Sequence, residues 1–254
     1  MVLEKNNAVA SNFQVLGGYY YTGNHIKLVA NLAVDKKRLL GSTVKVEVTQ
    51  PSIGFGTFAS NATIRIPRQI IQQEKDVVLS RADKKLQTLA SKKMTLPTKV
   101  STITLNDKGE NGDEIPGDGR YSGIFKQTQY DGVYSFRFIA GNQKLRREKL
   151  ISVHMKSGIS PVKTELAVLN RRYIAANKQT TLKVQVTPMD KFGNKIGFGY
   201  ADQLDFGIKQ SEVVSVKDKL DGSYEVELKV QGKYQAKPQL KPMKRRLQVK
   251  QRQR

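Results

Sequence analysis

Short runs of alternating apolar and polar residues recur along most of the chain. The clearest run covers residues 43–49, where three valines are separated by Lys45 and Glu47. A period of two is typical of a β-strand with one buried face and one face in water. Similar runs continue from residue 26 to residue 230, divided by Gly, Pro, Asn and Asp residues that favour turns. The pattern predicts an all-β protein built from β-sandwiches.

The period changes once, between Pro67 and Pro97. There the apolar residues follow one another at spacings of three, four and seven, which places them on one face of a helix. We predict a single amphipathic helix at about residues 68–93, inserted in the first sandwich and docked on it. A helix that binds a partner protein is the alternative. The predicted apolar face consists of Ile71, Val78, Ala82, Leu86 and Leu89.

The length of 254 residues is enough for two domains, each with a core of its own. Residues 156–161 contain Ser, Gly and Pro and are typical of a linker. We therefore expect two immunoglobulin-like β-sandwiches in tandem, the first of which carries the helical insertion. The expected order is an N-terminal lead (1–17), the first sandwich (18–155), the second sandwich (156–240) and a basic C-terminal tail (241–254).

A similar turn precedes one strand of each predicted sandwich. Asp131-Gly132 is followed by a strand with Tyr134, and Asp221-Gly222 is followed by a strand with Tyr224. In immunoglobulin-like sandwiches, a tyrosine near such a corner can hydrogen-bond to the backbone upstream. We expect both tyrosines to be structural.

An acidic, glycine-rich turn interrupts the strand pattern after Leu105. Four of its side chains fall at positions one, five, seven and twelve of a loop, and Gly112 at position six allows a sharp bend. Such a set of oxygen ligands suits Ca²⁺, although the β-like flanks differ from those of an EF-hand. Alternatively, the Asp and Asn side chains form Asx-turns and the glycines supply positive φ. The candidate Ca²⁺ ligands are Asp107, Asn111, Asp113 and Asp118.

The chain is strongly basic, with 44 Lys and Arg against 22 Asp and Glu and a formal net charge of +22. Such a charge favours anionic partners, nucleic acid or acidic glycan among them. The basic residues are dispersed, and only the tail forms a block without carboxylates. The alternative for the tail is a solvated terminus. Candidate polyanion-binding residues are Arg171, Arg172, Lys244, Arg245, Arg246, Lys250, Arg252 and Arg254.

Several kinds of chemistry find no support in the sequence. The chain has no cysteine, which excludes disulfides, thiolate metal sites and a cysteine nucleophile. Its two histidines, His25 and His154, accompany no G-x-S-x-G, P-loop or dinucleotide-binding motif. No run reaches the ~18 apolar residues of a membrane helix. We predict a noncatalytic protein that needs no cofactor, takes no small-molecule substrate and does not insert into membranes.

Two segments resemble known families. The segment 105–125 reads L-x-D-x-G-x-N-G-D-x-x-x-G-D-G-x-Y-S-G-x-F and precedes D-G-x-Y-x-F. It resembles a β-sandwich module that accompanies von Willebrand factor A-like domains in bacterial surface and secreted proteins. Residues 186–200, V-T-P-M-D-K-F-G-N-K-I-G-F-G-Y, together with 218–224, resemble the filamin-type immunoglobulin repeat. The resemblance spans roughly residues 18–240 and implies an accessory, adhesive or scaffolding role outside the cytoplasm.

The charge departs from this resemblance, because such modules are often acidic or near neutral. We expect a structural or interaction protein located outside the cytoplasm, with its leader absent from this chain. It would bind a protein partner, or assemble with itself, through sandwich surfaces. Two alternatives stay open at this point. One is a polyanion-binding module that uses the basic tail, and the other is an accessory domain of a larger A-domain protein or enzyme.

Overall fold

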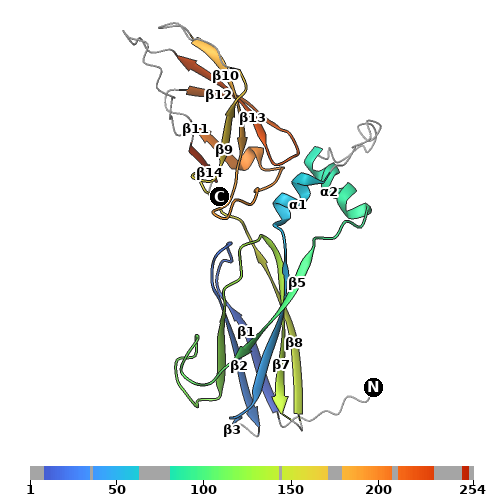
Figure 1. Ribbon diagram of the computed structural model, residues 1–254, viewed down its shortest axis with the longest axis vertical. Helices are drawn as coiled ribbons and strands as arrows, with labels where there is room; N and C mark the ends of the chain where they lie inside the picture. The colour runs from blue at the N-terminus through green and yellow to red at the C-terminus, as the bar shows by residue number, and fades with distance from the viewer. Residues whose placement is uncertain are drawn as a thin grey trace. The chain divides into compact units, whose positions relative to one another are not determined.

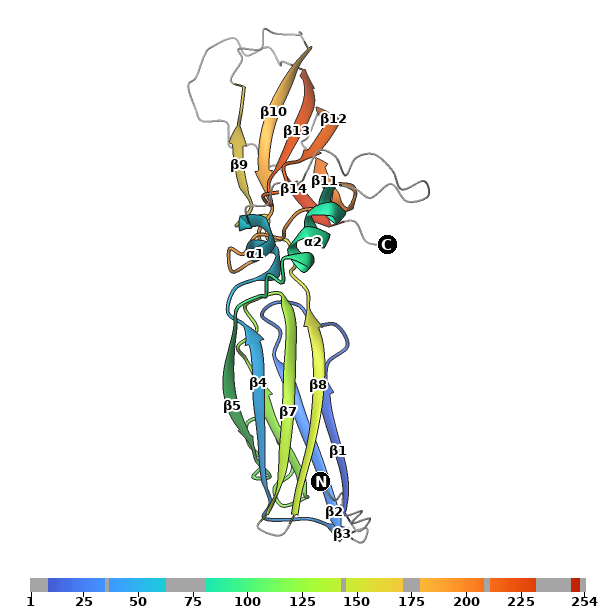
Figure 2. The same cartoon turned by 90° about the vertical axis from the view of Figure 1, so that its right-hand side faces the viewer.

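The chain folds into two compact units, each built mainly from antiparallel β-strands (Figures 1 and 2). We call residues 1–53 and 97–156 module 1, and residues 54–96 and 157–254 module 2. Both are open sandwiches of the immunoglobulin-like class, as the strand pattern predicts. The computed structural model describes residues 9–34, 37–62, 81–142, 145–170, 179–207, 211–231 and 248–251.

Module 1 consists of two antiparallel sheets. In the larger sheet, shown in Figure 2, the order is β5-β4-β7-β8. In the other sheet, β2 pairs with β1, β3 and β6. The strands of module 1 are β1 (Val9–Leu16), β2 (Ile26–Val34), β3 (Lys37–Arg38), β4 (Thr43–Pro51), β5 (Thr98–Leu105), β6 (Arg120–Phe125), β7 (Gly132–Asn142) and β8 (Leu145–Met155).

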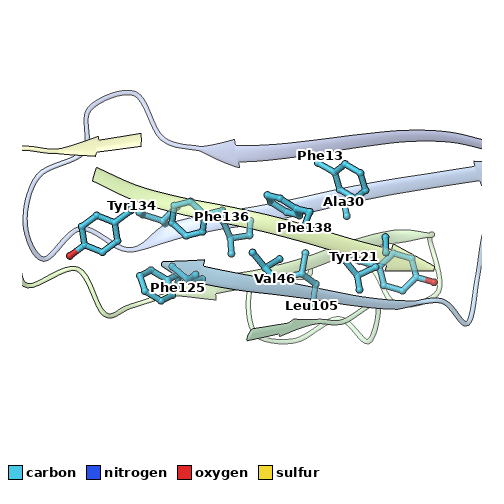
Figure 3. Close-up of a cluster of buried hydrophobic side chains, with 14 of the residues drawn as sticks. Phe13, Ala30, Val46, Leu105, Tyr121, Phe125, Tyr134, Phe136 and Phe138 are labelled. Carbon is cyan, nitrogen blue, oxygen red and sulfur yellow. The ribbon is translucent and has the colours of Figure 1, made fainter. Parts of the chain in front are cut away.

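The core of module 1 lies between these sheets, and aromatic rings occupy much of it (Figure 3). The ring centroids of Phe13 and Phe138 are 5.3 Å apart, and Phe125 meets Phe136 edge to face at 5.6 Å. Along β4 the valines at 44, 46 and 48 are fully buried while Lys45 is exposed. The strand predicted from the alternation of residues 43–49 is therefore confirmed.

Module 2 contains a four-stranded antiparallel sheet of order β12-β13-β10-β9 and a two-stranded pair, β11-β14. Its core includes Val186, Phe206, Tyr224 and Leu228. A short 3-10 helix, η2 (Ala201–Gln203), precedes β11. The strands are β9 (Glu165–Val168), β10 (Gln179–Thr187), β11 (Leu204–Gly207), β12 (Ser211–Asp218), β13 (Tyr224–Gln231) and β14 (Gln248–Gln251).

The strand β14 changes the interpretation of the basic tail. Residues 248–251 pair in antiparallel register with β11, so part of the segment predicted as a tail at 241–254 belongs to a sheet. The sequence signal for this strand is one valine between polar residues, which is too short to show a period. Deleting the tail would therefore remove a strand of module 2.

The helical insertion also differs from its prediction. The described residues contain two α-helices, α1 (Phe55–Asn61) and α2 (Arg81–Ser91). Residues 68–80 of the predicted helix lie outside the described residues. Helix α2 confirms the C-terminal half of the predicted helix, whereas α1 was missed because Gly54, Gly56 and Asn61 favour a loop. Neither helix is long and apolar enough to span a membrane among the residues described.

The insertion packs within module 2, whereas the sequence predicted that it docks on the first sandwich. Ala59 of α1 and Leu89 of α2 share a buried cluster with Phe198 and Leu220. The buried face also differs from the predicted one, since Leu86 is exposed and Lys85, which is not part of the predicted apolar face, is buried. A period in sequence shows that one helix face is buried but does not identify the surface that covers it.

Both predicted structural tyrosines are confirmed. The Tyr134 hydroxyl donates to the carbonyl oxygen of Tyr130 at 2.9 Å, and the Tyr224 hydroxyl donates to that of Gly197 at 2.9 Å. The Tyr224 oxygen also accepts from the backbone N–H of Tyr200 at 3.2 Å. Each tyrosine fixes a corner of its own module.

Candidate functional sites

The acidic turn of module 1 connects β5 to β6 and is held together by its own carboxylates. The two oxygens of Asp107 accept the backbone N–H groups of Asp118 and Gly119, each at 3.0 Å. Asp113 Oδ2 accepts the N–H of Gly109 at 2.7 Å, and Asp118 Oδ1 accepts that of Arg120 at 2.8 Å. The bond from Arg120 to Asp118 has the spacing of an Asx-turn, as in the alternative interpretation, and all four bonds stabilise the turn.

The same bonds bring three of the four predicted ligands together. Carboxylate oxygens of Asp107, Asp113 and Asp118 lie within 4.8 Å of one another, and Asp113 is 7% exposed. Asn111 lies in the same turn, with its backbone in the left-handed region at φ 52°. Three carboxylates so close repel one another, and a divalent cation would relieve this repulsion.

A Ca²⁺ ion takes six to eight oxygen ligands, so these three carboxylates could supply only part of its coordination shell. Backbone carbonyls and water would supply the rest. Two ion pairs lie beside the turn, Lys27 to Glu114 at 2.5 Å and Arg38 to Asp118 at 3.8 Å. The hydrogen bond from Lys27 lowers the pKa of Glu114. The donor set fits a hard cation, and the neighbouring cations oppose its binding.

Two aspartates of module 2, Asp190 and Asp218, accept hydrogen bonds from the backbone of turns. Asp190 is fully buried, and its Oδ1 accepts the backbone N–H groups of Phe192 and Asn194 at 2.9 Å each. Asp218 Oδ1 accepts the N–H of Leu220, whose backbone has φ 62°. Among the described residues these carboxylates hold the loops onto which the insertion docks.

The docking surface of the insertion centres on a buried lysine of α2. Lys85 is only 5% exposed, and its ammonium group donates to the carbonyl oxygen of Leu220 at 2.5 Å and to that of Ser60 at 3.5 Å. It also lies 4.7 Å from the ring centroid of Phe198. Burial lowers the pKa of Lys85, while the carboxylates of Asp221 and Asp218 act in the opposite direction. No sequence signal distinguished this lysine from its exposed neighbours.

Helix α1 approaches module 2 through a glycine and a threonine. A Cβ atom on Gly56 would lie 2.4 Å from the backbone oxygens of both Lys195 and Ile196. The hydroxyl oxygen of Thr57 accepts the backbone N–H of Lys195 at 2.9 Å. Only glycine permits this approach.

The edges of the β5-β4-β7-β8 sheet and of the β12-β13-β10-β9 sheet differ in how they are protected from further pairing. β8 carries the charges of Arg146, Glu148 and Lys149, and β12 has a register irregularity between Val213 and Ser215. Charges and bulges both discourage a strand from accepting another strand. The third edge, β5, has Lys99 among mainly hydroxyl-bearing residues.

The fourth edge, β9, has no charge after its first residue, Glu165, and no register irregularity. Its sequence continues as Leu166, Ala167 and Val168, followed by Leu169, with no charge and no proline. All four are exposed, with Leu166 at 44% and Val168 at 49%. In the described chain β9 pairs with β10 alone. An apolar, uncharged edge of this kind is a template for another strand.

The predicted polyanion-binding side chains all lie outside the part of the chain whose side chains the structure describes. Lys250 lies in β14, whose side chains are not described, and the other members of the set lie outside the described residues. These are Arg171, Arg172, Lys244, Arg245, Arg246, Arg252 and Arg254.

Comparison with known proteins identifies no family for this chain. No protein-family model matches the chain, and no curated protein matches it. Among solved structures, bacterial invasin, described as an integrin-binding protein, aligns at 14% identity and TM-score 0.34 over 88% of this chain and 34% of invasin. The Escherichia coli adhesin FdeC aligns at 13% identity and TM-score 0.44 over 87% of this chain and 55% of that structure.

Escherichia coli alpha-2-macroglobulin also aligns, at 10% identity and TM-score 0.36 over 91% of this chain and 15% of that protein. The chain thus spans about a third to a half of the two adhesin structures and a small part of the macroglobulin. At these sequence identities a likeness concerns the fold alone. The immunoglobulin-like assignment therefore stands on the chain's own sheets and cores.

Proposed function

We propose that this chain is a noncatalytic structural or interaction subunit, of scaffold or adhesion type, that binds a protein partner through the β9 edge of module 2. The observation that carries this proposal is the uncharged, exposed sequence of residues 166–169 at a sheet edge. Backbone hydrogen bonds along such an edge supply affinity, and the alternate side chains supply specificity.

The chemistry of the partner follows from charge. With a net charge of +22, two copies of this chain repel one another, so a second copy is disfavoured at this edge. An extended segment with apolar side chains at alternate positions and carboxylates beside them would complement both the edge and the field around it. We assign the edge to such a segment of a different, acidic protein.

The proposal includes a location outside the cytoplasm. It is supported by the sequence resemblance to modules of bacterial surface and secreted proteins and by the tandem arrangement of two sandwiches. A kinship with the accessory modules of A-domain proteins, and of module 2 with filamin-type repeats, belongs to the same proposal. Attachment to a larger parent protein would place these modules as its accessory part.

Peptide binding tests the β9 edge directly. Random peptides displayed on phage are selected on the full chain, and synthetic versions of the enriched sequences are titrated by fluorescence anisotropy. We expect apolar residues at alternate positions in the enriched peptides. Val168→Lys should weaken their binding at least tenfold, because a lysine on an edge strand discourages pairing.

The matched control is Val214→Lys on β12, which makes the same substitution at an exposed valine on the irregular edge. It should leave peptide affinity unchanged. Peptides that bind Val168→Lys as tightly as the natural chain would contradict the proposal. A dimer in sedimentation velocity that Val168→Lys dissociates would instead make a second copy the occupant.

We also propose that the acidic turn takes Ca²⁺, on the convergence of Asp107, Asp113 and Asp118. Calorimetric titration should give a Kd on the order of 0.1–1 mM, the range of extracellular Ca²⁺ modules. Asp113→Asn retains an oxygen for the Gly109 N–H and removes one charge, so it should abolish the binding heat while the circular dichroism spectrum is unchanged. Equal heats in both proteins would refute the assignment.

The net charge keeps polyanion binding as the alternative function. Because β14 is part of module 2, the charges should be substituted and the segment kept. Retention on heparin that falls steeply with salt, and falls further when Lys244, Arg245 and Arg246 are changed to Gln, would make this alternative the leading function. Weak retention of both the natural chain and the variant would favour an acidic protein, and not a polyanion, as the partner of the basic residues.

A further inference from the structure

The insertion begins and ends in module 1, and its two ends are joined there. β4 enters the insertion and β5 leaves it, and Pro51 of β4 lies opposite Thr98 of β5 in the sheet. Beyond this pair, the backbone N–H of Ser52 donates to the carbonyl oxygen of Pro97 at 2.9 Å. Residues 54–96 therefore form a closed excursion from the edge of one sheet.

The body of the same excursion belongs to module 2. Lys85 binds the Leu220 carbonyl, Thr57 binds the Lys195 backbone, and Leu89 enters a buried cluster with Phe198. Both kinds of contact, hydrogen bonds between side chains and backbone groups and apolar packing, are of the type that stabilises a domain interior. The ends of the insertion are therefore joined in module 1, and its helices pack in module 2.

We infer that the insertion couples the folding stabilities of the two modules. Pairing β4 with β5 closes a long loop, which costs conformational entropy when the loop is free. When α1 and α2 are docked in module 2, the ends of that loop are already restrained, so much of this cost has been met. Docking of the insertion in module 2 therefore stabilises module 1 through the chain that connects them.

The coupling is reciprocal. A free energy shared by two folding equilibria acts equally on both, so the folded β4-β5 pair must favour docking by as much as docking favours the pair. Unfolding of module 1 would leave the insertion tethered to module 2 only through residues 97–156, at a lower effective concentration. In a subunit that links a partner to a scaffold, the two modules would therefore tend to unfold together.

Native-state hydrogen exchange on the full chain tests this inference, with mass spectrometry of peptides from β4, β5 and β7. The test variant is Gly56→Ala, because the added methyl would meet the backbone oxygens of Lys195 and Ile196 and so undock α1. We expect the protected amides of module 1 to exchange at least tenfold faster, although residue 56 belongs to module 2. The expectation holds whether or not module 2 stays folded in the variant.

The matched control is Gly158→Ala in module 2, where a Cβ would meet nothing within 4 Å. It should leave exchange unchanged in both modules. Leu89→Ala, which shortens a buried side chain of α2, is a second undocking variant and should act in the same direction. Unchanged exchange in module 1 with both undocking variants would show that the modules fold independently and would overturn the inference. Peptide binding at β9 is a separate readout, so the two proposals can fail separately.

Discussion

Replacing Lys85 with Glu is expected to destabilise module 2 by about 3–5 kcal/mol, the usual cost of leaving a buried charge without its partners. The natural ammonium group donates to the carbonyl oxygens of Leu220 and Ser60 and lies over the ring of Phe198. A carboxylate offers no donor to those oxygens and would be repelled by them. Urea unfolding followed by amide exchange at β13, which belongs to module 2, measures the loss.

The prediction has an internal check in its pH dependence. A protonated carboxyl group at position 85 of the variant can donate one hydrogen bond, so the difference between the variant and the natural chain should shrink as the pH falls toward about 4. Lys92→Glu makes the same charge change at an exposed residue just beyond α2, and we expect it to cost less than about 0.5 kcal/mol. Equal costs for the two substitutions would mean that Lys85 does not hold the insertion in place.

The sheets could be predicted from sequence because each strand of a half-buried sheet carries its own period. The valines of β4 alternate with Lys45 and Glu47, and the structure buries the three valines while Lys45 is exposed and Glu47 is half-buried. The tyrosine corners were predictable for a similar reason, since the turn and the strand that form each corner are adjacent in sequence. These features depend on local pattern, which a single sequence contains.

The dock of the insertion could not be predicted, because it depends on residues far apart in the chain. Lys85 binds Leu220 across 135 positions, and Thr57 meets Lys195 across 138. In the sequence, Lys85 is one of two adjacent lysines on a helix whose predicted apolar face includes Leu86. A buried lysine that binds carbonyl oxygens has the same local pattern as a solvated one.

The acidic turn lies between these cases. Sequence spacing placed Asp107, Asp113 and Asp118 in one turn, and the structure brings their carboxylates within 4.8 Å. It also shows what spacing could not, namely that each carboxylate accepts a backbone N–H group. Metal binding and turn stabilisation therefore use the same residues, and only a charge-removing substitution that keeps an acceptor separates the two roles.

Alkaline pH should unfold the protein through two of its buried tyrosines, Tyr134 and Tyr224. Burial raises the pKa of Tyr134 to about 12 and raises that of Tyr224 as well, from an ordinary value of 10.0. Because the folded-state pKa of Tyr134 lies above the unfolded value, the stability due to its neutral phenol is complete below about pH 10 and is lost as the pH rises through about 12. We expect the free energy of unfolding to fall steeply between these two values.

The substitution Tyr134→Phe separates the hydroxyl from the ring. Below about pH 10 it should cost about 1 kcal/mol, because the half-buried carbonyl of Tyr130 loses its donor while the ring stays packed. At higher pH the variant should lose stability less steeply than the natural chain, since no proton has to leave at residue 134. Tyr19→Phe, at a residue 83% exposed, is the control and should match the natural chain at every pH. A Tyr134→Phe curve parallel to the natural one between about pH 10 and about 12 would show that ionisation of this phenol does not drive alkaline unfolding, and would place its cause in other groups of the chain.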